Sequence, residues 1–307
     1  NYDYLSNYSI LLLILTFIFG VFYVIYLNKI NILPKIYFVR TISEYKNILN
    51  FSKYSLIGGG VSMLSQQSTS ILLNKFFGVI LNASNGIVNQ VNAALFQILS
   101  SIQSAFSPLL MKAFVSGDTD EIKKIMFLFT RLCAITYLVI AIPLIILMPE
   151  VLAIWLKEVP PLTANFAKLM VISLFFDVLS TPLWTLAHAE GHIKRYQISL
   201  SIIIVLNIFL AWILLFLSHN PMVLWYVKIF GSVCLFIYRY FYSKSIMIFS
   251  FWDYFNQSLK PSLWFALSLG LSWFFYFYYE SLIIYLFFYI VVVIFSIYLF
   301  ALNKTEK

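Results

Sequence analysis

A stripe of amide side chains is the feature of this sequence best suited to hold a polar ligand. Its members, in the segment 84–107, are Asn85, Asn89, Asn92 and Gln103. In a helix these four positions lie within about 60° of one another and therefore share one face. Amide groups donate and accept hydrogen bonds, so the stripe predicts either a hydrated cavity for a polar solute or hydrogen bonds to a neighbouring helix.

A second stripe lies in the preceding segment, where Ser62, Gln66 and Ser70 recur at every fourth residue. Hydrogen bonds between membrane helices are common, but each contributes about 1 kcal/mol or less, and a few amides would suffice for them. Because two consecutive segments both carry a long stripe, we favour the hydrated cavity and keep helix–helix hydrogen bonds as the alternative.

Two charged residues, Arg131 and Asp177, are embedded in apolar segments. Arg131 lies about seven residues, or roughly 10 Å, from the nearer end of its segment, and Asp177 about ten residues, or roughly 15 Å. Similar depths allow an ion pair between them. The long Arg131 side chain can instead extend to the membrane interface, whereas Asp177 is too short for this and must pair or face water.

Two other polar motifs have simpler explanations than catalysis. Asp118-Thr119-Asp120 spells the DxD string of metal-dependent glycosyltransferases, but no soluble fold surrounds it, so a carboxylate cap on the next helix is the better interpretation. The HxExH string at 188–192 resembles a metal cluster that lacks a fourth ligand. We therefore predict no metal, no cofactor and no enzymatic activity.

The elements that must position these residues follow from composition. Hydrophobic residues make up 62% of the 307 positions and charged residues 10%, whereas a soluble domain has about 45–50% and roughly 25%. Such a chain cannot cover a surface that faces water, so its solvent is lipid. The net charge of +8 is spread over the joints between apolar segments, which indicates membrane topology rather than binding to nucleic acid.

Nine apolar segments are each long enough, at about 20 residues, to cross the ~30 Å hydrocarbon core as a helix. They cover residues 9–27, 54–74, 84–107, 124–148, 163–187, 197–217, 222–243, 261–279 and 281–301. The sequence thus predicts an all-α integral membrane fold with about nine transmembrane helices. Pro108 is expected to end the third helix, and the joint Glu150–Leu162, which contains Trp155, is expected to form a short interfacial helix.

Positive charge alternates between the joints. Fifteen of the 20 Lys and Arg residues lie at one set of joints, whereas the opposite set holds two, Lys75 and Lys157. Of the three that fall inside segments, Lys168 and Lys228 lie near segment ends and are expected to extend to the interface. By the positive-inside rule, this distribution predicts an N-terminus outside and a C-terminus in the cytoplasm.

Residues 46–200 contain a series of short motifs whose order and spacing resemble those of one transporter family. The motifs are Phe76-Phe77-Gly78, Asn85-Gly86-Ile87-Val88-Asn89-Gln90-Val91-Asn92, Pro108, Ser116-Gly117-Asp118, Arg131, Ile154-Trp155-Leu156, Val159-Pro160, Pro182-Leu183, Gly191, Ile193-Lys194 and Tyr196-Gln197. They resemble the polysaccharide (O-antigen, Wzx-type) flippases of the MOP exporter superfamily, which are MATE-like. The charged string at 188–192 departs from that pattern.

The resemblance implies a fold of two pseudo-symmetric six-helix lobes followed by a helix pair. Residues 1–53 would then be the last helix of the N-terminal lobe with a cytoplasmic linker. Residues 54–245 would be the MATE-like six-helix C-terminal lobe, and residues 246–307 the C-terminal helix pair with a short cytoplasmic tail. Because the chain opens at Asn1 rather than Met, we expect it to be N-terminally truncated.

The resemblance also implies a substrate, a polyprenyl-pyrophosphate-linked oligosaccharide moved across the bacterial cytoplasmic membrane for surface polysaccharide synthesis. The implied partners are this lipid-linked oligosaccharide, membrane lipids and, as a candidate, the polysaccharide polymerase machinery. Amide stripes suit sugar hydroxyls, and Arg131 suits an anionic headgroup. The residues assigned to the translocation cavity are Gln66, Ser70, Asn85, Asn89, Asn92, Gln103, Arg131 and Asp177.

Three other functions compete with this one. A MATE-type cation-coupled drug or toxin exporter would share the fold and differ in the chemistry of its cavity. An integral membrane O-antigen polymerase or ligase would need a large outside loop, and the outside joints here are short. A purely structural subunit would not need the polar stripes.

The topology is testable by cysteine-accessibility labelling in intact cells. Cysteines placed near Lys35, Lys123 and Lys194 should be protected from an impermeant reagent, because these joints carry the cytoplasmic positive charge, whereas one near Lys157 should be labelled. Labelling of the Lys194 and Lys157 positions from the same side would overturn the topology.

Overall fold

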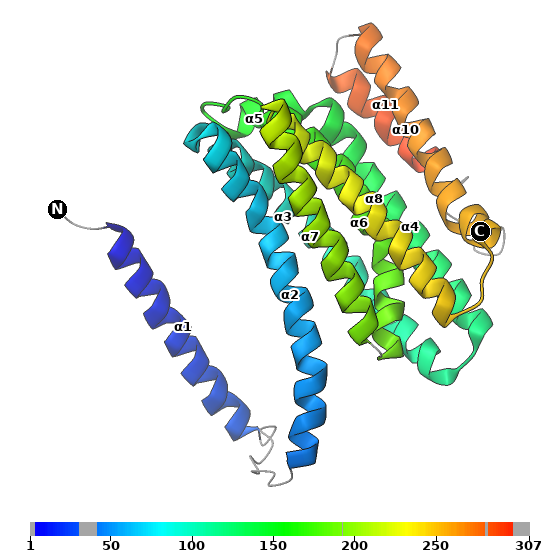
Figure 1. The fold of residues 1–307 in the computed structure, drawn as a ribbon. Helices are drawn as coiled ribbons and strands as arrows, with labels where there is room; N and C mark the ends of the chain where they lie inside the picture. The colour runs from blue at the N-terminus through cyan, green and yellow to red at the C-terminus, as the bar shows by residue number, and fades with distance from the viewer. Residues whose placement is uncertain (1–3, 31–41, 192, 280–281, 297–307) are drawn as a thin grey trace. The chain divides into compact units, whose positions relative to one another are not determined.

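The computed structural model describes residues 4–30, 42–191, 193–279 and 282–296. Every element in these ranges is a helix (Figure 1). The helices are α1 (Tyr4–Lys29), α2 (Ile42–Phe77), α3 (Val79–Ser116), α4 (Thr119–Ile146), α5 (Met148–Trp155), α6 (Thr163–Glu190), α7 (Ile193–Ser218), α8 (Met222–Ile246), α9 (Phe251–Tyr254), the π-helix η1 (Phe255–Leu259), α10 (Lys260–Tyr279) and α11 (Leu282–Ser296).

Six of the described helices have the length and apolar composition of a membrane span: α1, α3, α4, α6, α7 and α8. Each predicted segment overlaps one long helix, apart from residues 281 and 297–301 of the last segment, which lie outside the described residues. The all-α integral membrane fold is therefore confirmed. Glycine and amide residues lower the apolar content of α2. It remains a predicted span, as do α10 and α11.

The chain divides into two compact units, Asn1–Ile48 and Leu49–Lys307, with the boundary inside α2. In the first unit, α1 exposes its large apolar side chains, among them Leu13 and Phe17, as a helix in contact with lipid does. The predicted division of the remaining chain into a six-helix lobe ending at residue 245 and a helix pair stays a prediction.

Within the second unit, α6 is the central helix, since it packs against α3, α4, α5, α7 and α8. Small hydroxyl residues let α6 and α8 approach closely: Ser173 Oγ lies 3.0 Å from Ser232 Oγ, and Ser243 Oγ donates to the Leu183 carbonyl at 3.3 Å. Because lipid tails are as apolar as leucine, close packing and hydrogen bonds, rather than the hydrophobic effect, hold such helices together.

The helices α10 and α11 form a pair that packs beside α4 (Figure 1). The Tyr289 hydroxyl donates to the Val139 carbonyl of α4 at 2.6 Å. Around this bond, Phe265, Tyr285 and Leu138 form a buried apolar cluster. The C-terminal pair is thus fixed to the rest of the second unit through α4.

The prediction that Pro108 ends a helix is wrong, because α3 continues through Pro108 to Ser116. At 38 residues, α3 is about 57 Å long, well beyond the ~30 Å hydrocarbon core. Proline is tolerated inside membrane helices when neighbouring groups satisfy the freed carbonyl. The helix ends instead at Gly117, whose φ of 77° is a left-handed conformation that glycine adopts without strain.

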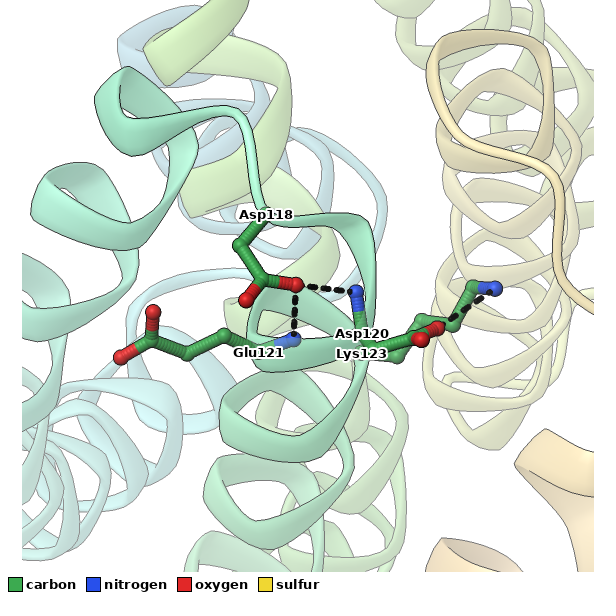
Figure 2. A network of polar contacts seen from close by, with 4 residues as sticks. All are labelled: Asp118, Asp120, Glu121 and Lys123. Carbon is green, nitrogen blue, oxygen red and sulfur yellow. Dashed lines mark hydrogen bonds and ion pairs between the residues drawn. The ribbon is translucent and has the colours of Figure 1, made fainter.

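The turn from α3 to α4 confirms the interpretation of the DxD string as a helix cap (Figure 2). Asp118 Oδ1 accepts hydrogen bonds from the backbone N–H groups of Asp120, at 3.0 Å, and of Glu121, at 3.1 Å. Lys123 Nζ lies 3.6 Å from Asp120 Oδ1 in an exposed ion pair. These carboxylates therefore stabilise the start of α4.

Within the joint expected to form a short interfacial helix, the structure has α5, an element of eight residues, whereas residues 156–162 are not helical. Its Met148 and Leu152 side chains are buried, whereas Ile154 and Trp155 are exposed. An exposed tryptophan on a short helix at a span end suits the membrane–water interface.

Candidate functional site

The first contact between the two predicted stripes lies between α2 and α3. Asn85 Nδ2 donates a hydrogen bond of 2.8 Å to Ser70 Oγ, and the Asn85 side chain is only 1% exposed. The structure thus brings together one predicted residue from each stripe. In this conformation both serve a helix–helix contact, which was the alternative interpretation of the stripes.

The far end of the amide stripe makes a similar contact between α3 and α6. Gln103 Nε2 donates to Thr181 Oγ1 at 3.1 Å. The Thr181 hydroxyl in turn donates to the backbone carbonyl of Asp177, at 3.2 Å, one turn earlier in α6. Gln103 therefore joins α3 to the helix that carries the predicted acidic residue.

The other members of the stripes are more accessible. Gln66 and Asn89 are exposed, and Asn92 is half-buried. The difference arises because the buried face of α3 is centred on Val88 and Leu95, and Asn89 is displaced by about 100° from Val88 around the helix. The predicted stripe therefore straddles the edge between the packed and the accessible surface.

A second polar face of α3, which the sequence reasoning missed, is fully accessible. It consists of Gln90, Gln97, Ser101 and Ser104, all exposed, and we call it the Gln90 face. These positions lie within about 60° of one another around the helix. The Ser104 hydroxyl donates to the Ser101 carbonyl at 2.8 Å, which leaves the hydroxyl oxygen available as an acceptor.

The neighbours on this face are small. Between positions 83 and 108, the residues nearest its centre are Ala83, Gly86, Ala94 and Pro108, all exposed. The sequence signal was present in the spacing of positions 90, 97, 101 and 104. The asparagines at 85, 89 and 92 form a stronger polar pattern on the neighbouring face, and the sequence analysis followed that pattern.

Exposed positions on α7 differ from the Gln90 face and have the composition expected of a surface in contact with lipid. Leu206, Phe209 and Phe216 are large, apolar and exposed. Hydrocarbon offers no hydrogen-bond partners. The transfer of a polar group from water into it therefore costs about 2–7 kcal/mol of free energy. The Gln90 face therefore suits water or a polar solute, not lipid tails.

Asp177 lies partly buried in α6 and faces polar groups of α8. Ser232 Oγ donates to Asp177 Oδ2 at 3.4 Å, and the cations that act on the carboxylate are Arg239 and Lys228. Lys228 Nζ lies 4.8 Å from the centre of the buried Trp225 ring, one turn earlier in α8. Asp177 thus contacts α8 through the Ser232 hydroxyl and lies near enough to the α8 cations for an electrostatic interaction.

Arg131 is enclosed by the bundle. It lies in α4 and is 2% exposed, which makes it one of the largest fully buried side chains of the described chain. A side chain extended to the interface would be exposed, so Arg131 is held within protein rather than snorkelling. In this conformation it lies in the packed interior and not on an accessible face.

Two residues of the HxExH string, His188 and Glu190, make hydrogen-bond contacts within the protein. His188 Nδ1 lies 3.0 Å from the Trp184 carbonyl, and Glu190 Oε2 accepts a hydrogen bond of 2.9 Å from the Tyr242 hydroxyl. His192 lies outside the described residues. Among the residues that are described, no group of three His, Cys, Asp or Glu side chains is placed to hold a metal ion.

The described helices and their apolar composition define an all-α integral membrane protein. The structure is similar to the outward-facing conformation of a multidrug resistance MATE family transporter of the MOP superfamily, with a TM-score of 0.59 and 16% identity. The likeness covers 74% of this chain and 54% of the transporter, so the chain spans about half its length. No protein-family model matches the sequence, and neither does any curated protein.

Two asparagines one turn apart on α3 can separate structural from solute-facing amides. Asn85→Ala should lower the free energy of unfolding by about 0.5–1 kcal/mol, because it removes a buried helix–helix hydrogen bond. Asn89→Ala, its exposed control, should leave stability nearly unchanged. Unfolding in mixed SDS micelles, followed by circular dichroism, measures both. Equal losses for the two variants would contradict the assignment.

Proposed function

We propose that this chain is part of a flippase that moves a polyprenyl-pyrophosphate-linked oligosaccharide across the bacterial cytoplasmic membrane for surface polysaccharide synthesis. The MATE-like fold supports a transporter. The observation that carries the choice of substrate is the Gln90 face, an exposed strip of amides and hydroxyls on a membrane-spanning helix. The lipid-linked oligosaccharide and the polymerase machinery that would consume it remain proposed partners.

The chemistry of the face matches the physical problem of this transport. A sugar chain cannot cross hydrocarbon without replacing its bonds to water, so a transporter must offer donors and acceptors along the path. Gln90 and Gln97 supply both, and the serine oxygens accept. Their small neighbours leave room for a bulky sugar ring, while the polyprenyl tail stays in the bilayer.

A cation-coupled drug exporter is the second candidate, because the similar solved structure is described as a multidrug resistance transporter. The two candidates differ in what the accessible face should carry. A site for a cationic drug gains from carboxylates, whereas the Gln90 face is neutral. We therefore favour the neutral, hydroxyl-rich substrate.

The test replaces the polar side chains of the face while keeping their size. Gln90→Leu together with Gln97→Leu should reduce surface polysaccharide roughly thirtyfold at matched protein levels, because two hydrogen bonds of about 1 kcal/mol each are lost. The measurement is surface polysaccharide in a strain whose own copy is deleted, with lipid-linked oligosaccharide expected to accumulate in the membrane.

The matched control is Gln257→Leu, the same change at an exposed glutamine of η1 away from the face. It should support wild-type levels. Normal polysaccharide in the double variant would refute the flippase proposal. Unchanged polysaccharide accompanied by a new drug sensitivity would favour the exporter instead.

Arg131 gives an independent test of headgroup binding. To bind a headgroup, its enclosed guanidinium would have to become accessible when helices separate during transport. If it holds the pyrophosphate, Arg131→Lys should reduce polysaccharide output, since lysine lacks the bidentate fork, and Arg131→Ala should abolish it. Protein levels must be matched, because removal of a buried side chain also lowers stability. Wild-type output from Arg131→Ala would end this assignment.

A further inference from the structure

The joint between α8 and α10, residues 247–260, folds into an elbow whose inner face is aromatic and buried. Phe249 and Tyr254 are enclosed, and their rings lie 6.0 and 5.8 Å from that of Phe127 in α4. Ser258 Oγ donates to the Phe127 carbonyl at 3.1 Å. These contacts fix the elbow against α4, so its outer face has a defined orientation.

The outer face of the elbow exposes large apolar side chains. Ile248 is 89% exposed, Trp252 is 66% exposed and Phe251 is 48% exposed. The Phe251 and Trp252 rings lie 6.0 Å apart. The Ser250 hydroxyl caps the short helix by accepting from the Trp252 N–H at 3.2 Å. The apolar group is therefore held in place by the backbone.

Positive charge flanks this apolar group. Lys244 near the end of α8 and Lys260 at the start of α10 are both exposed, and Asp253 is the exposed acidic residue within the elbow. Phe241 of α8 and Leu263 of α10, near the two ends of the elbow in the sequence, are also large, apolar and exposed. The elbow thus carries exposed apolar side chains and is flanked in the sequence by two lysines.

We propose that the elbow binds an anionic phospholipid at the membrane interface. The Ile248, Phe251 and Trp252 side chains enter the boundary between headgroups and acyl chains, where aromatic residues are favoured. The Lys244 and Lys260 ammonium groups contact the lipid phosphate. The Lys and Arg distribution predicts that this joint is cytoplasmic, the side on which anionic lipid attracts basic segments. This site is independent of any transported substrate.

Native mass spectrometry of the purified 307-residue chain in detergent tests the proposal. Phosphatidylglycerol should be retained in preference to phosphatidylcholine with the same acyl chains. Lys244→Gln with Lys260→Gln should weaken phosphatidylglycerol binding about fivefold for each lysine removed. Phosphatidylcholine binding should not change. Lys244→Arg with Lys260→Arg should keep the preference, because the charges remain.

The matched control is Lys112→Gln with Lys124→Gln, which removes two exposed lysines from another joint on the same predicted side. It should retain the phosphatidylglycerol preference. An equal loss in this control, or undiminished binding in the Lys244 and Lys260 glutamine variant, would overturn the proposal.

The depth of the elbow can be measured separately by tryptophan fluorescence in bilayers. The contribution of Trp252 to the emission is the difference between the wild-type protein and Trp252→Phe. This contribution should be quenched strongly by lipids brominated near the headgroup and weakly by lipids brominated at the chain end. A Trp252 component that neither lipid quenches would place the elbow outside the membrane and refute the proposal.

Discussion

The absence of hydrogen-bond partners in hydrocarbon is the constraint on which this structure depends. It requires backbone groups to bond within a helix, and it makes each polar side chain in a span find a partner or an aqueous surface. The described bundle meets this demand with hydroxyl and amide pairs: Asn85 with Ser70, Gln103 with Thr181, and Ser173 with Ser232. The same contacts connect α2, α3, α6 and α8.

Much of the fold was predictable because the bilayer sets a fixed length for apolar segments. The runs of apolar residues in the sequence correspond to long helices, and the cap at Asp118 and the short helix α5 were recognised from local chemistry alone. These features depend on neighbours in the sequence, such as a carboxylate before a helix or a tryptophan after a span. Their physics is complete within a few residues.

The side of each helix that packs was not predictable in the same way. Periodicity groups Asn85 with Asn89, but only the packing of α6 against α3 and the hydrogen bond to Ser70 of α2 distinguish the buried from the exposed residue. Pro108 was misjudged for a related reason, since neighbours decide whether a proline breaks a membrane helix. The Asp177 and Ser232 side chains, which share a hydrogen bond, lie 55 residues apart in the sequence. Tertiary contacts supply the missing information.

The turn at Gly117 and Asp118 has a mechanical consequence. Two residues separate α3 from α4, and two fully extended residues span at most about 7 Å. With Asp118 already bonded to the start of α4, little slack is left to absorb a sliding motion. The two helices should therefore move together. A displacement of α3 along its axis should also displace the part of α4 that carries Arg131.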